Sequence, residues 1–366
     1  MTNRHRVLQV LLVLLVLQVL VLQAQNPWKQ AEPGYAYQFP RDHAAHPDNK
    51  IEWWYYTGNL DAKDGRRFGF QVTFFRVGID AAPANPSKWA VRDVYMTHLA
   101  VSDVKGQRYR FEQKLTRGGP GLAGAAADRY YVWNEDWTGT LDGEGQHVLK
   151  LEGRTAGVDL LLDPGKRPVI HGRNGISQKG ANSGNASHYY SLTKMPTSGT
   201  ITIEGEQVAV TGFTWMDHEF GTTFLEPEQR GWDWLSIQLE DGREVMLYQL
   251  RRSDGSKDAR SSGTIVAADG RSTFLANTDF TLTPKSRTFA SKNGARYPIE
   301  WTLSIPAQKL DLTITTPLAD QELTLERSSG VAYWEGLIDI AGSARGRGYL
   351  EMTGYYGSLS GVLSGQ

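Results

Sequence analysis

The sequence predicts an all-β protein composed of two antiparallel β-barrel domains packed together. Apolar and polar residues alternate over many short runs, which is the period of a strand with one buried face. Asp-Gly pairs, which favour tight hairpin turns, separate these runs. No long stretch carries the apolar stripe of a helix that packs on a core. Many short strands joined by such turns form a sandwich or a barrel.

The strand and turn signals recur along most of the chain. The alternating runs are residues 68–74, 148–151, 200–203, 235–239, 301–305 and 310–314. The turn signals are Asp64-Gly65, Asp142-Gly143, Asp241-Gly242, Asp254-Gly255 and Asp269-Gly270. The 39 glycines and the aromatic content of 11% suit tight turns and strands that pack large side chains.

A weak internal repeat divides the chain into two domains. Residues 51–56 begin one block and residues 231–237 begin another, and each block places aromatic residues on its first strand before a hairpin. We therefore expect one barrel over residues 25–225 and a second over residues 226–366. The aromatic residues at both starts predict that these two strands meet at a shared interface.

The first 24 residues have the pattern of a secretory signal peptide. Arg4 and Arg6 supply positive charge, residues 7–22 are apolar apart from two glutamines, and Ala24 is a small residue before a cut. The apolar run is shorter than the about 20 residues that span a membrane, so cleavage is favoured over retention as an anchor. We expect a periplasmic or secreted protein that meets the membrane only through this segment.

Charge and composition exclude several classes of function. Without the two arginines of the signal segment, 37 basic residues remain beside 40 acidic ones, a net charge of −3, so no nucleic-acid partner is expected. The chain has no cysteine, which excludes disulfides, thiolate metal sites and a cysteine nucleophile. It carries no phosphate loop or dinucleotide fingerprint, and no cofactor is predicted.

Residues 212–221 hold the most informative chemistry. In a strand, Trp215, Asp217 and Glu219 share one face and His218 points to the other. Desolvation beside a tryptophan raises the pKa of Asp217, which would let it donate a proton at neutral pH. The alternative is a strand end at which Asp217 and His218 hydrogen-bond to a turn.

A second constellation lies near the start of the first block. In a strand, Glu52 and Trp54 share one face, and Trp53 and Tyr55 occupy the other. A buried glutamate must be paired or neutral. Arg76 is the expected partner, and we favour a structural ion pair.

Metal and serine-hydrolase sites have weaker support. A metal site would use Asp217, Glu219, His98 and His188, whose spacing matches no zinc pattern, so no metal is predicted. His98 either faces a pocket or satisfies a backbone group. Residues 356–361 come closest to a nucleophile elbow but lack its spacing and its strand-to-helix context.

Several stretches together resemble the AttH-like and hydroxyneurosporene synthase (carotenoid 1,2-hydratase) family. They are residues 46–58, 96–103, 175–179, 187–191, 215–221 and 231–234. The resemblance implies two lipocalin-like β-barrel domains with a pocket between or within them. The family includes carotenoid hydratases, fungal proteins that catalyse pericyclic cyclisations, and secreted bacterial members, many named hydrolases and associated with ABC exporters. One fold hosts several activities, so fold does not decide function.

The resemblance also implies a catalytic set. In the hydratases, water adds to an isolated terminal double bond without a cofactor, and the matching positions here are His188, Tyr190, Trp215 and Asp217, with the order of Trp and Tyr reversed. Asp217 would protonate the alkene, and the rings of Trp215 and Tyr190 would stabilise the cation. His188 would take a proton from the attacking water.

The sequence is compatible with two principal functions. One is a cofactor-free hydratase or lyase that acts on an apolar molecule such as a terpenoid, a carotenoid or a lipid. The other is a non-catalytic periplasmic carrier that serves an ABC exporter, and a secreted hydrolase is a further alternative from the family's usual naming. An aromatic barrel mouth suits both principal functions. The residues expected to bind the hydrophobic ligand are Trp53, Trp54, Tyr55, Glu52, His98, His218 and Trp234.

Overall fold

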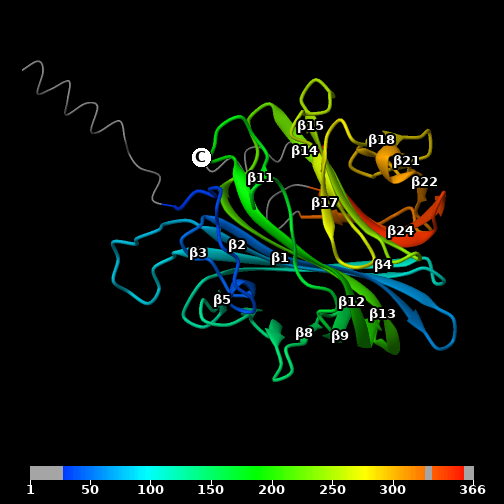
Figure 1. The fold of residues 1–366 in the computed structure, drawn as a ribbon. Helices are drawn as coiled ribbons and strands as arrows, with labels where there is room; N and C mark the ends of the chain where they lie inside the picture. The colour runs from blue at the N-terminus through cyan, green and yellow to red at the C-terminus, as the bar shows by residue number, and fades with distance from the viewer. Residues whose placement is uncertain (1–27, 326–331, 358–366) are drawn as a thin grey trace, which may run out of the picture.

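The computed structural model describes residues 28–325 and 332–357. Within these ranges the chain forms strands β1 to β25 and two short 3₁₀ helices, η1 (Arg41–His43) and η2 (Pro306–Gln308). The strands build two large antiparallel sheets, each curved into a barrel-like shape (Figure 1). The all-β prediction and the two barrels are confirmed.

The first sheet has 13 strands and runs in the order β4-β3-β2-β1-β13-β12-β9-β8-β7-β6-β5, with β10 and β11 paired to β12. Its strands are β1 (Ile51–Ala62), β2 (Arg67–Gly78), β3 (Asp93–Asp103), β4 (Arg108–Arg117), β5 (Ala123–Ala125), β6 (Tyr131–Asn134), β7 (Trp137–Leu141), β8 (His147–Glu152), β9 (Ala156–Leu162), β10 (Val169–Ile170), β11 (Ser177–Gln178), β12 (Ala186–Ile203) and β13 (Glu206–Thr223).

The second sheet has 10 strands in the order β17-β16-β15-β14-β25-β24-β22-β21-β18, with β23 paired to β24, and β19 and β20 form a separate hairpin. These strands are β14 (Gln229–Leu239), β15 (Glu244–Arg252), β16 (Ser262–Val266), β17 (Ser272–Ala276), β18 (Thr281–Pro284), β19 (Thr288–Ala290), β20 (Arg296–Pro298), β21 (Glu300–Ile305), β22 (Leu310–Thr315), β23 (Glu322–Thr324), β24 (Ala332–Gly342) and β25 (Gly346–Tyr356).

The two sheets repeat one pattern of pairing. In the first, β1 lies between β2 and β13, the last strand of that sheet. In the second, β14 lies between β15 and β25, again the last strand. The chain passes from one sheet to the other between Thr223 and Gln229.

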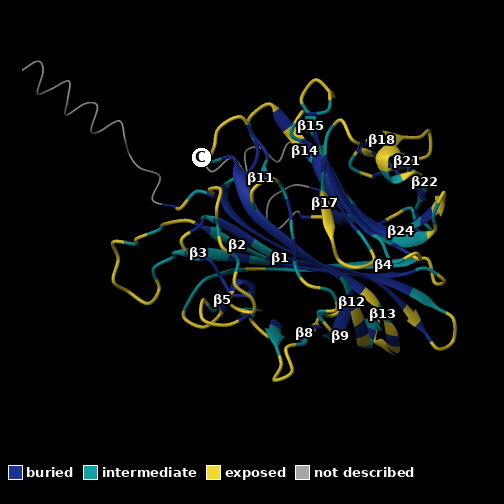
Figure 2. Ribbon diagram, in the orientation of Figure 1, coloured by how far each residue is buried: buried dark blue, intermediate teal, exposed yellow. Residues whose placement is uncertain are grey.

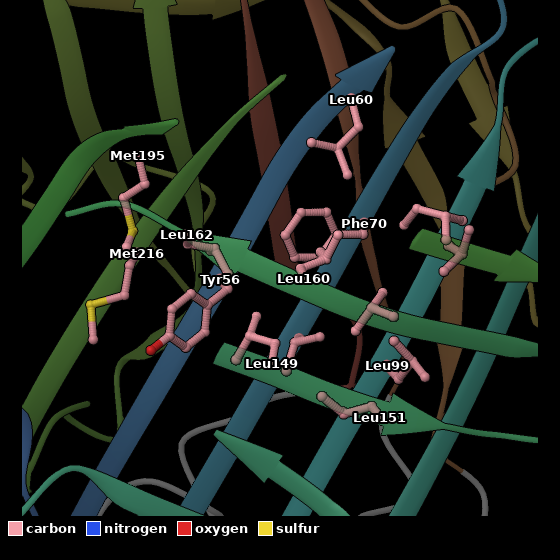
Figure 3. Packing of buried hydrophobic residues seen from close by; sticks show 14 of the residues in the cluster. Tyr56, Leu60, Phe70, Leu99, Leu149, Leu151, Leu160, Leu162, Met195 and Met216 are labelled. Atoms are coloured by element: carbon pink, nitrogen blue, oxygen red, sulfur yellow. The ribbon is translucent and has the colours of Figure 1, made fainter. Parts of the chain in front are cut away.

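Each barrel encloses its own apolar core. In the first, Tyr56 and Phe70 from one wall face Leu149 and Leu160 from the opposite wall (Figure 3). Trp301 and Trp334 lie in the core of the second. A third buried cluster, which includes Tyr55, Trp215 and Trp234, joins residues of both sheets. The strands where the sheets meet are accordingly buried, whereas the loops are exposed (Figure 2).

The strands at the centre of the first sheet therefore have two buried faces. One face points into the first barrel and the other meets the second sheet, and residues paired across neighbouring strands share a face. Tyr55, Asp217 and Ser191 are paired in register, as are Trp54, His218 and Tyr190 on the other face.

The signal segment expected at residues 1–24 lies outside the described residues. Among the residues that the structure describes, no helix combines the length and the apolar character needed to cross a membrane.

Candidate active site between the two sheets

A cavity of about 100 Å³ lies where the two sheets meet. The first sheet and the segments that follow it contribute Trp53, Tyr55, Thr73, Phe75, Lys179, Tyr189, Asp217, Glu219, Phe224 and Leu225. The second sheet contributes Trp232, Trp234, Tyr248, Leu250, Tyr333, Glu335 and Glu351. The aromatic starts of β1 and β14 thus meet at one interface, as the sequence predicted.

Asp217 is the acid of the wall formed by the first sheet. It is 3% exposed, and it accepts hydrogen bonds from the Tyr189 hydroxyl at 2.6 Å, from Trp215 Nε1 at 2.6 Å and from the Ser191 hydroxyl. Burial raises the pKa of Asp217 to about 7 even though these three donors lower it, and the nearby Glu219 carboxylate adds to the rise. The carboxyl is therefore partly protonated at neutral pH.

A hydrogen-bonded relay connects Asp217 with the second sheet. His171 Nε2 lies 2.6 Å from the Ser191 hydroxyl, and His171 Nδ1 lies 2.9 Å from the Thr264 hydroxyl of β16. Because Ser191 donates to Asp217, its oxygen accepts from His171 Nε2, and Nδ1 then accepts from Thr264; the tautomer is assigned from this network. Burial lowers the pKa of His171 to about 3, so the ring is neutral.

No pattern in the sequence pointed to His171, which follows β10 in a loop that borders β12. Its partner Ser191 is two residues from Tyr189, so strand alternation places both side chains on one face. Its position opposite Asp217 depends on the pairing of β12 with β13.

Lys179 pairs with a second acid of the cavity, Glu219. Its ammonium forms an ion pair with Glu219, which also accepts a hydrogen bond from the Ser187 hydroxyl. The same ammonium lies 5.1 Å from the centre of the Tyr248 ring. This pair satisfies the Glu219 charge and leaves Asp217 without a cationic partner among the described residues.

Three of the predicted ligand-binding aromatics line the cavity. Trp53 and Tyr55 come from β1, and Trp234 comes from β14. The Tyr55 and Trp234 rings meet edge to face at 5.1 Å, and Trp234 Nε1 donates to the Tyr189 hydroxyl at 3.0 Å. These contacts hold the rings in place around Asp217.

The structure does not bring His188 and Tyr190 to Asp217, and that expectation is wrong. Successive side chains of β12 alternate, so Tyr189 and Ser191 face the cavity while His188 and Tyr190 face the first barrel. His188 packs against Tyr35 at 4.5 Å, and burial lowers its pKa to about 4. It cannot take a proton from a water beside Asp217.

Three further predicted ligand contacts also face away from the cavity, into the first barrel. Glu52, Trp54 and His218 lie there for the same reason of alternation. Trp54 stacks on His218, with ring centres 4.9 Å apart. They belong to a separate buried polar cluster.

That cluster confirms the ion pair expected for Glu52. Arg76 Nε lies 3.1 Å from Glu52 Oε2, and His46 and His218 both lie 2.9 Å from Oε1. Burial opposes the charge, but the hydrogen bonds from the two histidines and the charge of Arg76 lower the pKa of Glu52.

The same cluster is the one group within the described ranges that is compact enough for a metal ion. Ligand atoms of His46, Glu52 and His218 lie within 4.8 Å of one another. All three atoms are already hydrogen-bonded within the cluster, and Arg76 adds a positive charge that would repel a cation. The arrangement fits a structural network better than a metal site.

His98 lies on the cavity side of its strand but outside the cavity lining. Its Nδ1 is 2.7 Å from the hydroxyl of Tyr333, so it joins β3 to β24. Burial lowers its pKa to about 3.

The fold and the site define a class of protein: two barrels that enclose, between them, an aromatic cavity with an uncompensated carboxyl group. The sequence profile of the AttH-like family matches residues 30–355, and the chain belongs to this family. A crystal structure of an AttH protein from Nitrosomonas europaea is 34% identical with a TM-score of 0.82, and the match covers 90% of this chain and 99% of that one. The resemblance seen in the sequence is confirmed.

Two more distant structures share the lipocalin-like fold. Kievitone hydratase from Nectria haematococca is 17% identical with a TM-score of 0.67, over 91% of this chain and 98% of that one. CghA is 12% identical with a TM-score of 0.55, over 89% and 97%. No curated protein matches the sequence.

Proposed function

We propose that the protein binds an apolar small molecule between its two barrels and protonates it, in a cofactor-free hydration or the reverse elimination. The observation that carries this proposal is the position of Asp217: a sequestered carboxyl with a pKa of about 7 in a cavity lined by aromatic rings. A carboxyl of this kind is protonated often enough at neutral pH to act as a general acid. A protein of the same fold is named as a hydratase, which supports the reaction class.

The chemistry requires a proton donor, a stabilised cation and a water. Asp217 transfers its proton to one carbon of an alkene, and the positive charge develops on the other carbon. The faces of Trp53, Tyr55 and Trp234 can stabilise that charge. Water then bonds to the cationic carbon and loses a proton, which the Asp217 carboxylate takes back, so the acid is regenerated. This cycle needs no histidine base.

The donors around Asp217 favour the proton transfer. Tyr189, Trp215 and Ser191 all donate to its carboxyl group, and such hydrogen bonds strengthen when the acceptor becomes a carboxylate. Ser191 and Tyr189 are held in place before the reaction by His171 and Trp234, respectively. The site is therefore organised for the charge that the reaction creates.

The size of the cavity restricts the ligand. An engineered cavity of about 150 Å³ holds one benzene ring, and this cavity is about 100 Å³. It accommodates the reacting end of a terpenoid, carotenoid or lipid and not the whole of a long molecule. We therefore propose a short apolar molecule, or the terminus of a longer one.

Carriage without turnover is the second candidate. The hydrogen-bonded relay from Asp217 through Ser191 and His171 ends on Thr264 of the second sheet, so it also fastens the two barrels together. A structural role of this kind would not require chemistry. In this proposal the protein is exported by its N-terminal segment and passes a hydrophobic molecule to or from an ABC exporter.

A serine hydrolase is less well supported by the geometry. The Ser191 hydroxyl donates to a carboxylate and accepts from His171, which is the reverse of an activated serine nucleophile. His171 is oriented by Thr264 and not by a carboxylate.

Copurified molecules offer the first test of this proposal. Apolar molecules extracted from the purified protein are identified by mass spectrometry and returned to the protein in ¹⁸O-labelled water. We expect incorporation of one labelled oxygen, and a loss of about 100-fold or more for Asp217→Asn, because the amide cannot donate the proton. His188→Gln is the control, since this residue faces the first barrel. Undiminished turnover by Asp217→Asn would refute the role of the acid, and binding without conversion by the unmodified protein would favour the carrier.

A further inference from the structure

We propose that the wall of the cavity formed by the second sheet is a binding site for a protonated amine, so that the ligand carries a basic nitrogen beside its apolar part. The site consists of Glu335 and Glu351 with the aromatic rings around them. This inference rests on the cavity of the proposed function and names the chemical class of its ligand.

The two glutamates are placed as a facing pair. Glu335 of β24 and Glu351 of β25 are directly opposite in the antiparallel ladder, and Glu351 is also opposite Trp234 of β14. All three side chains line the cavity. Two like charges at directly opposed positions destabilise a sheet. The pair therefore does not stabilise the sheet in the absence of a ligand.

Glu335 lacks the partner that a buried carboxyl requires. It is 1% exposed, and neither of its oxygens has a hydrogen-bond partner among the described residues. The Tyr55 hydroxyl is near enough to lower the pKa of Glu335 slightly, but it makes no hydrogen bond of ordinary geometry. An unpaired buried carboxyl is costly, which makes a ligand donor favourable at this position.

Other buried glutamates of the protein have cationic partners. Glu52 pairs with Arg76, Glu219 with Lys179, and Glu244 with Lys166. Lys179 is the single lysine or arginine among the described residues that line the cavity, and it is already paired with Glu219. No cationic side chain among the described cavity residues remains to pair with Glu335 and Glu351 in their ionised form, so a ligand would have to supply that charge.

The surroundings favour an organic cation over a metal ion. Within the described ranges, no three of the cavity carboxyls lie close enough together to share one ion. The rings of Trp53, Tyr55, Trp232, Trp234 and Tyr333 line the same space. Aromatic faces next to carboxylates are a common setting for ammonium groups, which bind through cation–π attraction and charge-assisted hydrogen bonds.

Binding of an amine should release a proton. Burial and the facing Glu351 raise the pKa of Glu335. Burial raises the pKa of Glu351 to about 7, a hydrogen bond from Trp232 opposes the rise, and Asp217 and Glu219 add to it. The phenols of Tyr55, Tyr109, Tyr333 and Tyr349 also lie near the pair, and burial and Glu335 raise their pKa values, so they stay neutral. Lys179 lines the same cavity and is paired with Glu219.

An ordinary alkylamine has a pKa of about 10 and arrives charged. The pair then ionises to meet it. Because the charge of the ammonium replaces the released proton, the net charge that faces Asp217 is unchanged to first order.

Three probes of equal chain length test the site by calorimetry: hexylamine, 1-hexanol and hexanoate. At pH 7 we expect hexylamine to bind about tenfold or more tightly than 1-hexanol, and hexanoate to bind most weakly. Measurement in two buffers of different ionisation enthalpy should show proton release with the amine and none with the alcohol. Glu335→Gln should abolish the preference and the proton release while leaving hexanol affinity within about twofold.

Two further variants control the experiment. Glu240→Gln removes one carboxylate from an exposed turn and should change nothing. If Glu335→Gln does not fold, Glu351→Gln provides the same test at the facing residue. Equal affinity for hexylamine and hexanol, or a preference that survives in both cavity variants, would overturn the amine site alone. Binding of neither probe by the unmodified protein would overturn the apolar site of the proposed function as well.

Discussion

The protonation of Asp217 depends on a balance between desolvation and three hydrogen bonds. Burial raises its pKa and the donors Tyr189, Trp215 and Ser191 lower it, with a result of about 7. In the unfolded chain an aspartate has a pKa of about 3.9. The folded state therefore holds more protons at this residue than the unfolded state between about pH 4 and pH 7.

Stability should consequently fall as pH rises through this window. A pKa raised from 3.8 to about 7 corresponds to at most about 4 kcal/mol, since one pH unit is worth about 1.4 kcal/mol. Asp217→Asn removes this term. As the pH rises from 5 to 8, the free energy of unfolding of Asp217→Asn should increase by about 2–4 kcal/mol relative to that of the unmodified protein. Urea unfolding at several pH values measures it.

Asp128→Asn serves as the control for that series, because Asp128 is exposed and its substitution should leave the pH dependence unchanged. A difference for Asp217→Asn that does not vary with pH would mean that its carboxyl ionises at an ordinary pKa.

The strand face was predictable from the sequence for some site residues and not for others. Strand alternation placed Trp215 and Asp217 on one face and His218 on the other, as the structure does. The same rule, applied to β12 together with its register, would have separated His188 from Asp217, but the register depends on pairing that the sequence does not show. His171 reaches Ser191 from a loop, whose path no periodicity describes.

Neighbouring strands approach one another closely where β14, β25 and the first sheet meet. A Cβ atom on Gly348 of β25 would lie 2.1 Å from the backbone oxygen of Ser236 in β14. The Asn59 side chain of β1 donates to the Gly348 oxygen at 3.0 Å. Gly348 thus joins two strands of the second sheet and one strand of the first.

Gly348→Ala should therefore weaken the interface between the barrels. The methyl group must displace backbone and not a flexible side chain, so we expect a loss of about 1–3 kcal/mol in the free energy of unfolding. Gly143→Ala is the matched control, because its Cβ would meet nothing within 4 Å. Equal stability of the two variants in thermal unfolding would show that the strands do not approach so closely.

The elements themselves were largely predictable. The alternating runs, the Asp-Gly turns and the aromatic starts of β1 and β14 correspond to strands, hairpins and a shared interface. Short-range pattern carries this information because a strand's alternation reflects which face is buried. The 18-residue lengths of β12 and β13 and their bulges come from pairing across the sheet and could not be foreseen.

For the whole molecule, the packing of one barrel on the other creates the cavity. Asp217 comes from the first sheet, whereas Glu335, Glu351 and Trp234 come from the second. Glu335 and Glu351 are more than a hundred positions from Asp217 in the chain, and no local pattern links them to it. The sequence could therefore indicate the acid and the aromatic interface, but not the second acidic wall.

The ionisation of Asp217 can be measured directly. The side-chain carboxyl carbon of Asp217, labelled with ¹³C and assigned by its absence in Asp217→Asn, can be titrated by NMR in the unmodified protein. We predict a midpoint of about 7. A midpoint near the ordinary aspartate value of about 3.9 would contradict a sequestered proton donor between the two barrels.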